Sequence, residues 1–158
     1  MIQTETLDST DIRLYTDASG LGLGGCYAGK WFSVPIENYY KYSIAFRELL
    51  AIVVAVLSWG DEWCNKQVVI YTDNEAIVYI WSTGSCKCKD IMTLIRLLFF
   101  FIAKRNINLL FHHIAGKANT HADLLSRLQV TRFKELFPEA ETWPTPIPSS
   151  ILAILRKL

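Results

Sequence analysis

The sequence predicts an α/β fold with a mixed five-stranded sheet, in which three antiparallel strands are followed by parallel strands and helices flank the sheet. Three observations lead to this class. A short alternating strand and a glycine-rich hairpin open the chain. Apolar helical stretches and β-branched strands then alternate, which is typical of a mixed sheet with helices on its faces. Finally, the tripeptide Tyr-Thr-Asp occurs twice after an apolar run, at Tyr15–Asp17 and Tyr71–Asp73.

The first half of the chain contains three expected strands and one helix. Residues 12–17 alternate in strand fashion, Ser19-Gly20 favours a turn, and residues 21–35 form a hairpin that closes near Pro35. The glycines do not form a phosphate loop, because no Gly-Lys-Ser/Thr ending and no helix follow them. Ser43 is expected to cap a helix that runs to about Trp59 and ends at Gly60.

The second half alternates between helices and strands. Residues 67–72 are rich in β-branched side chains and predict a buried strand. The further expected elements are a short helix over 74–81, a helix over 90–105 with a broad apolar face, a strand over 107–114, and a final helix from Asn119 to about Gln129.

These elements fit one domain. At 158 residues the chain is long enough for a sizeable core. We assign residues 1–9 to an N-terminal extension, 10–137 to the domain, and 138–158 to a proline-rich linker with a short C-terminal helical segment. Because so short a helix cannot stand alone, residues 151–158 either dock on the domain or begin a further region.

The composition is that of a globular protein, with 51% hydrophobic and 20% charged residues. The formal net charge is only +1, so contact with nucleic acid would rest on a local patch. The apolar runs 49–59 and 91–103 are shorter than the ~20 residues of a membrane-spanning helix, so we expect no membrane association.

The N-terminus has no apolar segment of the kind found in secretory signal peptides, so we expect an intracellular protein, cytoplasmic or nuclear, that is not secreted. The four cysteines include no Cys-x-x-Cys pair, which favours free thiols over a zinc site or disulfides.

Four carboxylates draw attention by their positions. Asp17 and Asp73 each end a strand, and two such strands side by side would hold both acids near one metal cluster. Glu48 has only apolar neighbours three and four residues away on its helix, and a buried carboxylate is costly unless it is paired or metal-bound. The alternative for Glu48 is an ion pair with Arg47 or Lys41.

Asp123 has a structural alternative of its own. It stands three residues after Thr120, which is the spacing of a capping box with Asp in place of the usual Glu. On spacing alone, a cap is favoured over a metal ligand.

Taken together, these acids resemble the ribonuclease H family. The matching motifs occur in the expected order over about residues 10–130: Thr16-Asp17-Ala18-Ser19-Gly20, Arg47-Glu48-Leu49, Thr72-Asp73-Asn74 and Ala122-Asp123-x-Leu125-Ser126-Arg127. The ending His-Ile-x-Gly-x-x-Asn-x-x-Ala-Asp-x-Leu-Ser-Arg is most similar to ribonuclease H domains of retroelement reverse transcriptases, of the gypsy type or of DIRS-like tyrosine-recombinase elements.

The resemblance implies a ribonuclease H-like fold and a metal-dependent endonuclease that hydrolyses the RNA strand of RNA/DNA hybrids. Asp17, Glu48, Asp73 and Asp123 would hold two Mg²⁺ ions, with Mn²⁺ as a substitute, and Asp17 would bridge them. Oxygen-only ligation suits these ions. Two ions about 3.5–4 Å apart can activate a water and stabilise the leaving 3′ oxygen. The implied partners are an RNA/DNA hybrid and the polymerase domain of a reverse transcriptase.

The resemblance also suggests further site residues. Related enzymes carry a mobile loop histidine that assists product departure, and His113 is the candidate here. Alternatively His112 and His113 simply end a strand, and His121 either touches substrate or faces water. Candidates for substrate binding are Ser19, Gly20, Asn74, Lys117 and Arg127.

Two other functions stay open at this point. A domesticated copy could keep the fold as a non-catalytic module that binds nucleic acid or protein, although such a module has no reason to bury Glu48. A nuclease of the same fold that acts on DNA typically uses three acids, so a fourth acid at Asp123 disfavours it.

Overall fold

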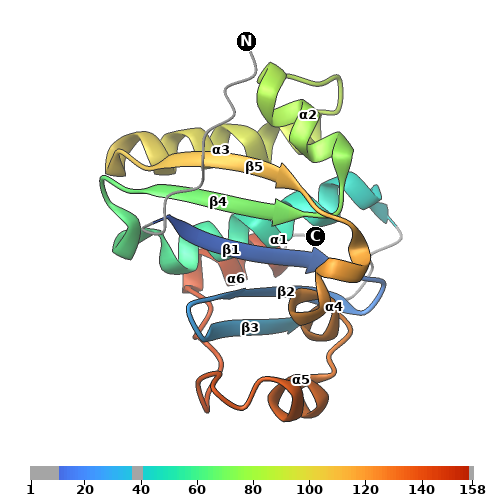
Figure 1. Ribbon diagram of the computed structural model, residues 1–158. Helices are drawn as coiled ribbons and strands as arrows, with labels where there is room; N and C mark the ends of the chain where they lie inside the picture. The colour runs from blue at the N-terminus through green and yellow to red at the C-terminus, as the bar shows by residue number, and fades with distance from the viewer. Residues whose placement is uncertain (1–10, 37–40, 157–158) are drawn as a thin grey trace.

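The computed structural model describes residues 11–36 and 41–156 and confirms the mixed sheet. Its five strands have the spatial order β3-β2-β1-β4-β5 (Figure 1). Strands β1 to β3 pair antiparallel, whereas β4 and β5 run parallel to β1. The strand bounds are β1 Ile12–Ala18, β2 Gly22–Tyr27, β3 Lys30–Pro35, β4 Gln67–Thr72 and β5 Asn108–His113.

The two Tyr-Thr-Asp copies lie side by side at the centre of this sheet. Tyr15 of β1 is in register with Tyr71 of β4, and their rings stack with centroids 4.7 Å apart. Because parallel strands in register end together, Asp17 and Asp73 emerge at the same edge of the sheet. The repeated tripeptide therefore reflects a shared position in the fold.

The helices lie on both faces of the sheet (Figure 1). The main core forms between the sheet and helices α1 and α3, and α1 has ten buried apolar side chains. A second, smaller core lies on the other face, where Leu124 and Phe133 pack on Cys26 and Trp31. The helix bounds are α1 Ile44–Trp59, α2 Glu75–Thr83, α3 Lys89–Arg105, α4 Thr120–Ser126, α5 Val130–Leu136 and α6 Ser149–Arg156, with 3₁₀ turns η2 Gly60–Trp63 and η3 Gly116–Ala118.

The ends of the first helices follow local chemistry. The Ser43 hydroxyl accepts a hydrogen bond from the Phe46 N–H and begins α1 as expected. The Asn74 side chain does the same for α2, and Gly84 ends α2 with a φ of 76°. A left-handed residue after a helix suits glycine because it has no Cβ.

The prediction of a single final helix to about Gln129 is wrong. Helix α4 ends at Ser126, and α5 begins at Val130 as a separate element. Between them Leu128 has a φ of 61°, a left-handed conformation that an L residue with a large side chain rarely adopts. The chain therefore turns here, and α5 packs Phe133 against Trp31 of the hairpin.

The C-terminal segment docks on the domain. The Thr145 N–H donates to the Trp31 carbonyl, and the Trp59 indole N–H donates to the Thr145 hydroxyl. Ile151 of α6 is fully buried in the main core, beside the partly buried Ile147 and Leu155. The segment thus passes the edge of the hairpin and returns to the side of the sheet that α1 covers (Figure 1).

Over the described ranges, no helix has both the length and the apolar character required to cross a membrane.

Candidate functional site

Three carboxylates meet where β1 and β4 end. Asp17 is the sixth residue of β1, Asp73 directly follows β4, and Glu48 lies in the second turn of α1. One oxygen from each lies within 4.8 Å of the other two. Asp17 and Glu48 are each only 4% exposed. The three acids form the one group within the described part of the chain that could hold a metal ion.

The burial of these acids makes their charged forms costly. Desolvation raises the pKa of Glu48 to about 9, and the charges of Asp17 and Asp73 add to the shift. Desolvation likewise raises the pKa of Asp17 to about 7, against a hydrogen bond from Ser126 that lowers it. At neutral pH the cluster therefore retains protons that free carboxyl groups would have lost.

The donor set fits a divalent cation. Glu48 Oε2 is buried and has no hydrogen-bond partner among the described residues, although buried polar atoms rarely stay unsatisfied. Carboxylate oxygens are the ligands that Mg²⁺ and Mn²⁺ prefer. A cation here would satisfy the unpartnered oxygen and offset the repulsion among the three carboxylates.

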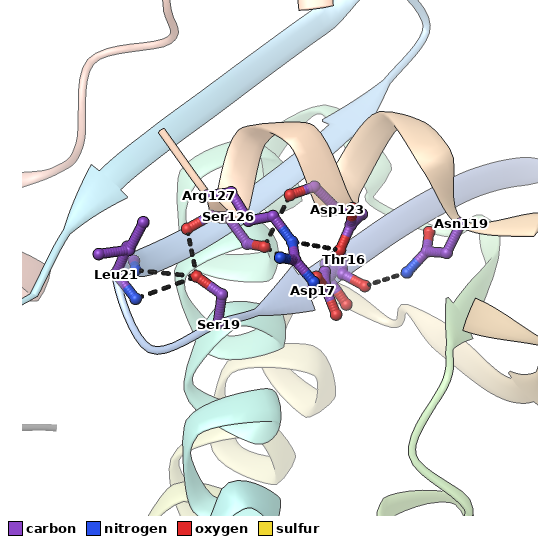
Figure 2. A network of polar contacts seen from close by, with 9 residues as sticks. Thr16, Asp17, Ser19, Leu21, Asn119, Asp123, Ser126 and Arg127 are labelled. Carbon is purple, nitrogen blue, oxygen red and sulfur yellow. Dashed lines mark hydrogen bonds and ion pairs between the residues drawn. The ribbon is translucent and has the colours of Figure 1, made fainter. Parts of the chain in front are cut away.

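The fourth predicted acid, Asp123, lies beside this cluster and outside its 4.8 Å spacing. It is close enough for its charge to raise the pKa of Asp17. Its Oδ1 accepts a hydrogen bond of 3.0 Å from Arg127 Nε, one turn further along α4 (Figure 2). Both side chains are solvent-accessible.

Thr120 and Asp123 do not form the capping box that their spacing allows. The Thr120 hydroxyl donates to the Lys117 carbonyl, and the Asp123 N–H donates to the Asn119 carbonyl. The N-cap position of α4 is Asn119, which makes no side-chain capping bond. Asp123 is thus free of a capping role, and its carboxylate stands toward Asp17 (Figure 2).

Glycine in β2 lets α4 approach the acids. Gly24 pairs with Asp17 across the β1–β2 ladder. A Cβ at Gly24 would lie 2.5 Å from the Ser126 nitrogen and 2.7 Å from the Ala122 carbonyl oxygen. The helix backbone therefore rests directly on the strand opposite Asp17, which brings Asp123 to the site.

Two polar side chains of this region were not among the predicted site residues (Figure 2). The Ser126 hydroxyl donates to Asp17 Oδ2 at 2.8 Å, and the Asn119 amide donates to the Thr16 carbonyl at 2.8 Å. Ser126 stands three residues after Asp123, so a shared helix face was a usable sign. For Asn119 the sequence offered only its place before a helix, which indicates a cap.

The predicted substrate-binding residues lie in the turns and helices that adjoin the acids in sequence or in space. Ser19 Oγ donates to the Ser126 carbonyl, Gly20 is exposed, and the Asn74 side chain caps α2. Arg127 pairs with Asp123, as described above. Lys117 is exposed in η3, next to Gly116, where an added Cβ would lie 3.5 Å from Asp73 Oδ2.

The histidines are placed differently. His113 ends β5, and its Nδ1 lies 3.8 Å from Glu75 Oε1, outside the acid cluster. His112 packs against the Tyr71 ring. His121 packs edge-on against Phe133 and Phe137, and desolvation lowers its pKa. His121 therefore belongs to the apolar contact between α4 and α5.

Comparisons with known proteins agree with this geometry. The family described as RNase H-like domain found in reverse transcriptase matches residues 8–101, more than half of the chain. A polyprotein of Cassava vein mosaic virus is 32% identical over 107 residues, which is 67% of this chain. The chain spans 16% of the length of that polyprotein.

Solved structures share the fold. LC11-RNase H1 isolated from compost superposes with a TM-score of 0.63 at 22% identity, over 77% of this chain and 96% of its own. RNase H1 from Halobacterium salinarum gives 0.59 at 12% identity, over 77% and 98%. LC11-RNase H1 has also been solved in complex with an RNA/DNA hybrid, and that structure superposes at 0.54 with 21% identity, over 73% and 93%. The chain belongs to the RNase H-like domain family found in reverse transcriptase, and its fold is that of ribonuclease H.

Proposed function

We propose that this chain is a divalent-metal-dependent endonuclease that hydrolyses the RNA strand of RNA/DNA hybrids within a retroelement reverse transcriptase polyprotein. The observation that carries the proposal is the buried Glu48 carboxylate within 4.8 Å of Asp17 and Asp73. A module without catalysis would keep three crowded, costly acids for no purpose. The gypsy-type or DIRS-like origin of the element stays a prediction.

Each acid has a distinct part in the proposed chemistry. Asp17, Glu48 and Asp73 would hold Mg²⁺ or Mn²⁺, and Asp123 would join them once Arg127 releases its carboxylate. When bound, such ions lower the pKa of a coordinated water and stabilise the charge of an in-line phosphoryl transfer. The protein's own contribution is to hold Asp17 and Asp73, at the ends of two parallel strands, next to Glu48 of α1 and the more exposed Asp123 of α4.

Two observations support the proposed substrate: a solved complex of a protein with the same fold, and the exposed residues near the acids. One protein of the same fold has been solved with an RNA/DNA hybrid. In this chain Lys117 is exposed next to Gly116, which lies close to Asp73, and Gly20 is exposed in the turn three residues after Asp17, so a sugar–phosphate backbone could pass here. A polymerase domain on the same polyprotein would deliver the hybrid, and the site of action would be intracellular.

The experiment compares three substrates. The protein is incubated with a labelled RNA/DNA hybrid, with duplex DNA and with duplex RNA, in Mg²⁺ and in EDTA. We expect EDTA-sensitive cutting of the hybrid alone, and its loss in Asp73→Asn. Binding without cutting would instead show an interaction module, and cutting of duplex DNA would show a DNA nuclease.

The role of Asp123 needs a separate variant. Asp123→Asn keeps the size of the side chain and its ability to accept from Arg127. If Asp123 is a ligand, cutting falls by at least about tenfold while the melting temperature stays unchanged. Undiminished cutting would remove Asp123 from the site and leave the three-acid cluster as the active group.

A further inference from the structure

The Ser126 side chain occupies an unusual position between α4 and the acid cluster. It is fully buried, and its Oγ lies 2.8 Å from Asp17 Oδ2 and 2.9 Å from the Asp123 carbonyl oxygen (Figure 2). A hydroxyl has one proton, so it serves one of these acceptors at a time. A carboxylate oxygen is a stronger acceptor than a peptide carbonyl oxygen, so the bond to Asp17 is favoured over the bond within α4.

The backbone of Ser126 is fixed from two sides. The Ser19 hydroxyl, in the turn that follows β1, donates to the Ser126 carbonyl at 2.7 Å. The Ser126 nitrogen lies against Gly24, the residue opposite Asp17 in the ladder. The hydroxyl is thus held at the Asp17 carboxylate by a rigid support, and it does not reach there through a flexible side chain.

We propose that Ser126 is a positioning residue for metal binding: its hydroxyl holds the Asp17 carboxylate in the orientation that the metal ion requires. The inference rests on the proposed function of the acid cluster. A carboxylate turns easily about its terminal torsion, and a donor to one oxygen restricts that rotation. Hydrogen bonds to ligating carboxylates orient them, and their loss typically costs 10–100-fold in metal affinity.

Ser33 provides a matched control. Its hydroxyl donates to the Leu125 carbonyl at 2.5 Å and so attaches α4 to β3, whereas the Ser126 hydroxyl donates to Asp17 of β1. Among the described residues, the Ser33 hydroxyl donates to this carbonyl and to no carboxylate, so its loss weakens only the docking of α4. Ser126→Ala and Ser33→Ala thereby separate orientation of Asp17 from attachment of the helix.

The test measures Mn²⁺ affinity by isothermal titration at one fixed pH, without nucleic acid. We expect Ser126→Ala to weaken Mn²⁺ binding at least about tenfold, Ser33→Ala to change it by less than about twofold, and Ser126→Thr, which keeps the hydroxyl, to bind more tightly than Ser126→Ala. NMR spectra of the backbone amides of each variant, recorded in EDTA, establish that the variant is folded. Alanine is smaller than serine, so Ser126→Ala introduces no clash.

Three other outcomes would each contradict a different part of the proposal. Unchanged affinity in Ser126→Ala would overturn the positioning role. Equal losses in Ser126→Ala and Ser33→Ala would reduce Ser126 to a helix-docking residue. Failure of the wild-type protein to bind Mn²⁺ would overturn the metal site itself, and the proposed function with it.

Discussion

Glu48 shows how the energetics of one residue expose a functional site. An apolar side chain at this position of α1 would pack well against its neighbours. Instead the position holds a carboxylate that is 4% exposed and lies next to two others. The sequence pattern already indicated the cost, since the neighbours of Glu48 on the helix are apolar. The structure adds the reason, because the Glu48 carboxylate lies with those of Asp17 and Asp73.

Replacing Glu48 tests this cost. The folded protein keeps a proton on Glu48 that the unfolded chain releases, and glutamine has no such proton to lose. We expect Glu48→Gln to raise the free energy of unfolding by about 1–2 kcal/mol at pH 8 in EDTA, or several degrees in melting temperature. The exposed Glu75→Gln is the control and should change little. A less stable Glu48→Gln would contradict the account.

The pH dependence of stability follows from the same two acids. Their folded pKa values, about 7 for Asp17 and about 9 for Glu48, lie above the unfolded values of 3.8 and 4.5. The folded state then binds more protons, so the stability that these acids contribute is complete below about pH 4 and is lost as the pH rises through 7 to 9.

Thermal unfolding in EDTA measures this effect. Between pH 5 and 9, the melting temperature of the wild-type protein should fall relative to that of Asp17→Asn/Glu48→Gln, in which neither group titrates. Saturating Mg²⁺ should reduce the fall, because a cation stabilises the charged form of both acids. Parallel pH profiles for the two proteins would show that the acids are not buried as described.

The hydrogen-bond partner of Ser126 could not be predicted from the sequence. The motif around Asp123 contains the serine, but nothing in the spacing tells whether its hydroxyl serves its own helix, water or a carboxylate. The answer depends on a contact between residues 109 positions apart, Asp17 and Ser126. Such contacts arise only once the helix has docked on the strand.

At the scale of elements, the approach of α4 to β2 positions the site. The glycine-rich hairpin was predicted from its turn signals, and the structure adds a packing reason for one of its glycines. We expect Gly24→Ala to lower the free energy of unfolding by about 1–3 kcal/mol, since its Cβ would meet helix backbone that cannot yield locally.

Gly20→Ala is the matched comparison for stability. A Cβ at Gly20 would have no atom of the described residues within 4 Å, so the variant should match the wild-type protein in thermal and chemical denaturation. Equal stability of Gly24→Ala and Gly20→Ala would show that α4 does not rest on the strand.

The bounds of helices and strands could be predicted where residue types near their ends determine them. The cap at Ser43 and the paired Tyr-Thr-Asp strands followed from residue type and pattern. The break after α4 did not, because Leu128 takes a left-handed conformation that its residue type disfavours. The sequence around Leu128 contains no glycine that would indicate a turn. In the structure the turn at Leu128 leads into α5, where Phe133 packs on Trp31.

For the molecule as a whole, the C-terminal helix is part of the domain. Ile151 is fully buried among side chains of the main core. We expect Ile151→Ala to cost about 2–4 kcal/mol in the free energy of unfolding, as for other large-to-small substitutions in a core. Leu152→Ala, half-buried on the same helix, should cost less than about 1 kcal/mol. Equal effects in denaturant titrations would contradict the docking of α6.

The proposed function requires that a water activated at the acid cluster attacks the RNA strand. The most direct measurement is the chemistry of the product ends after cleavage of a labelled RNA/DNA hybrid in Mg²⁺. Attack by water leaves a 5′-phosphate on one fragment and a 3′-hydroxyl on the other, and we expect these ends. Fragments that end in a 2′,3′-cyclic phosphate would show attack by the RNA's own 2′-hydroxyl and would contradict it.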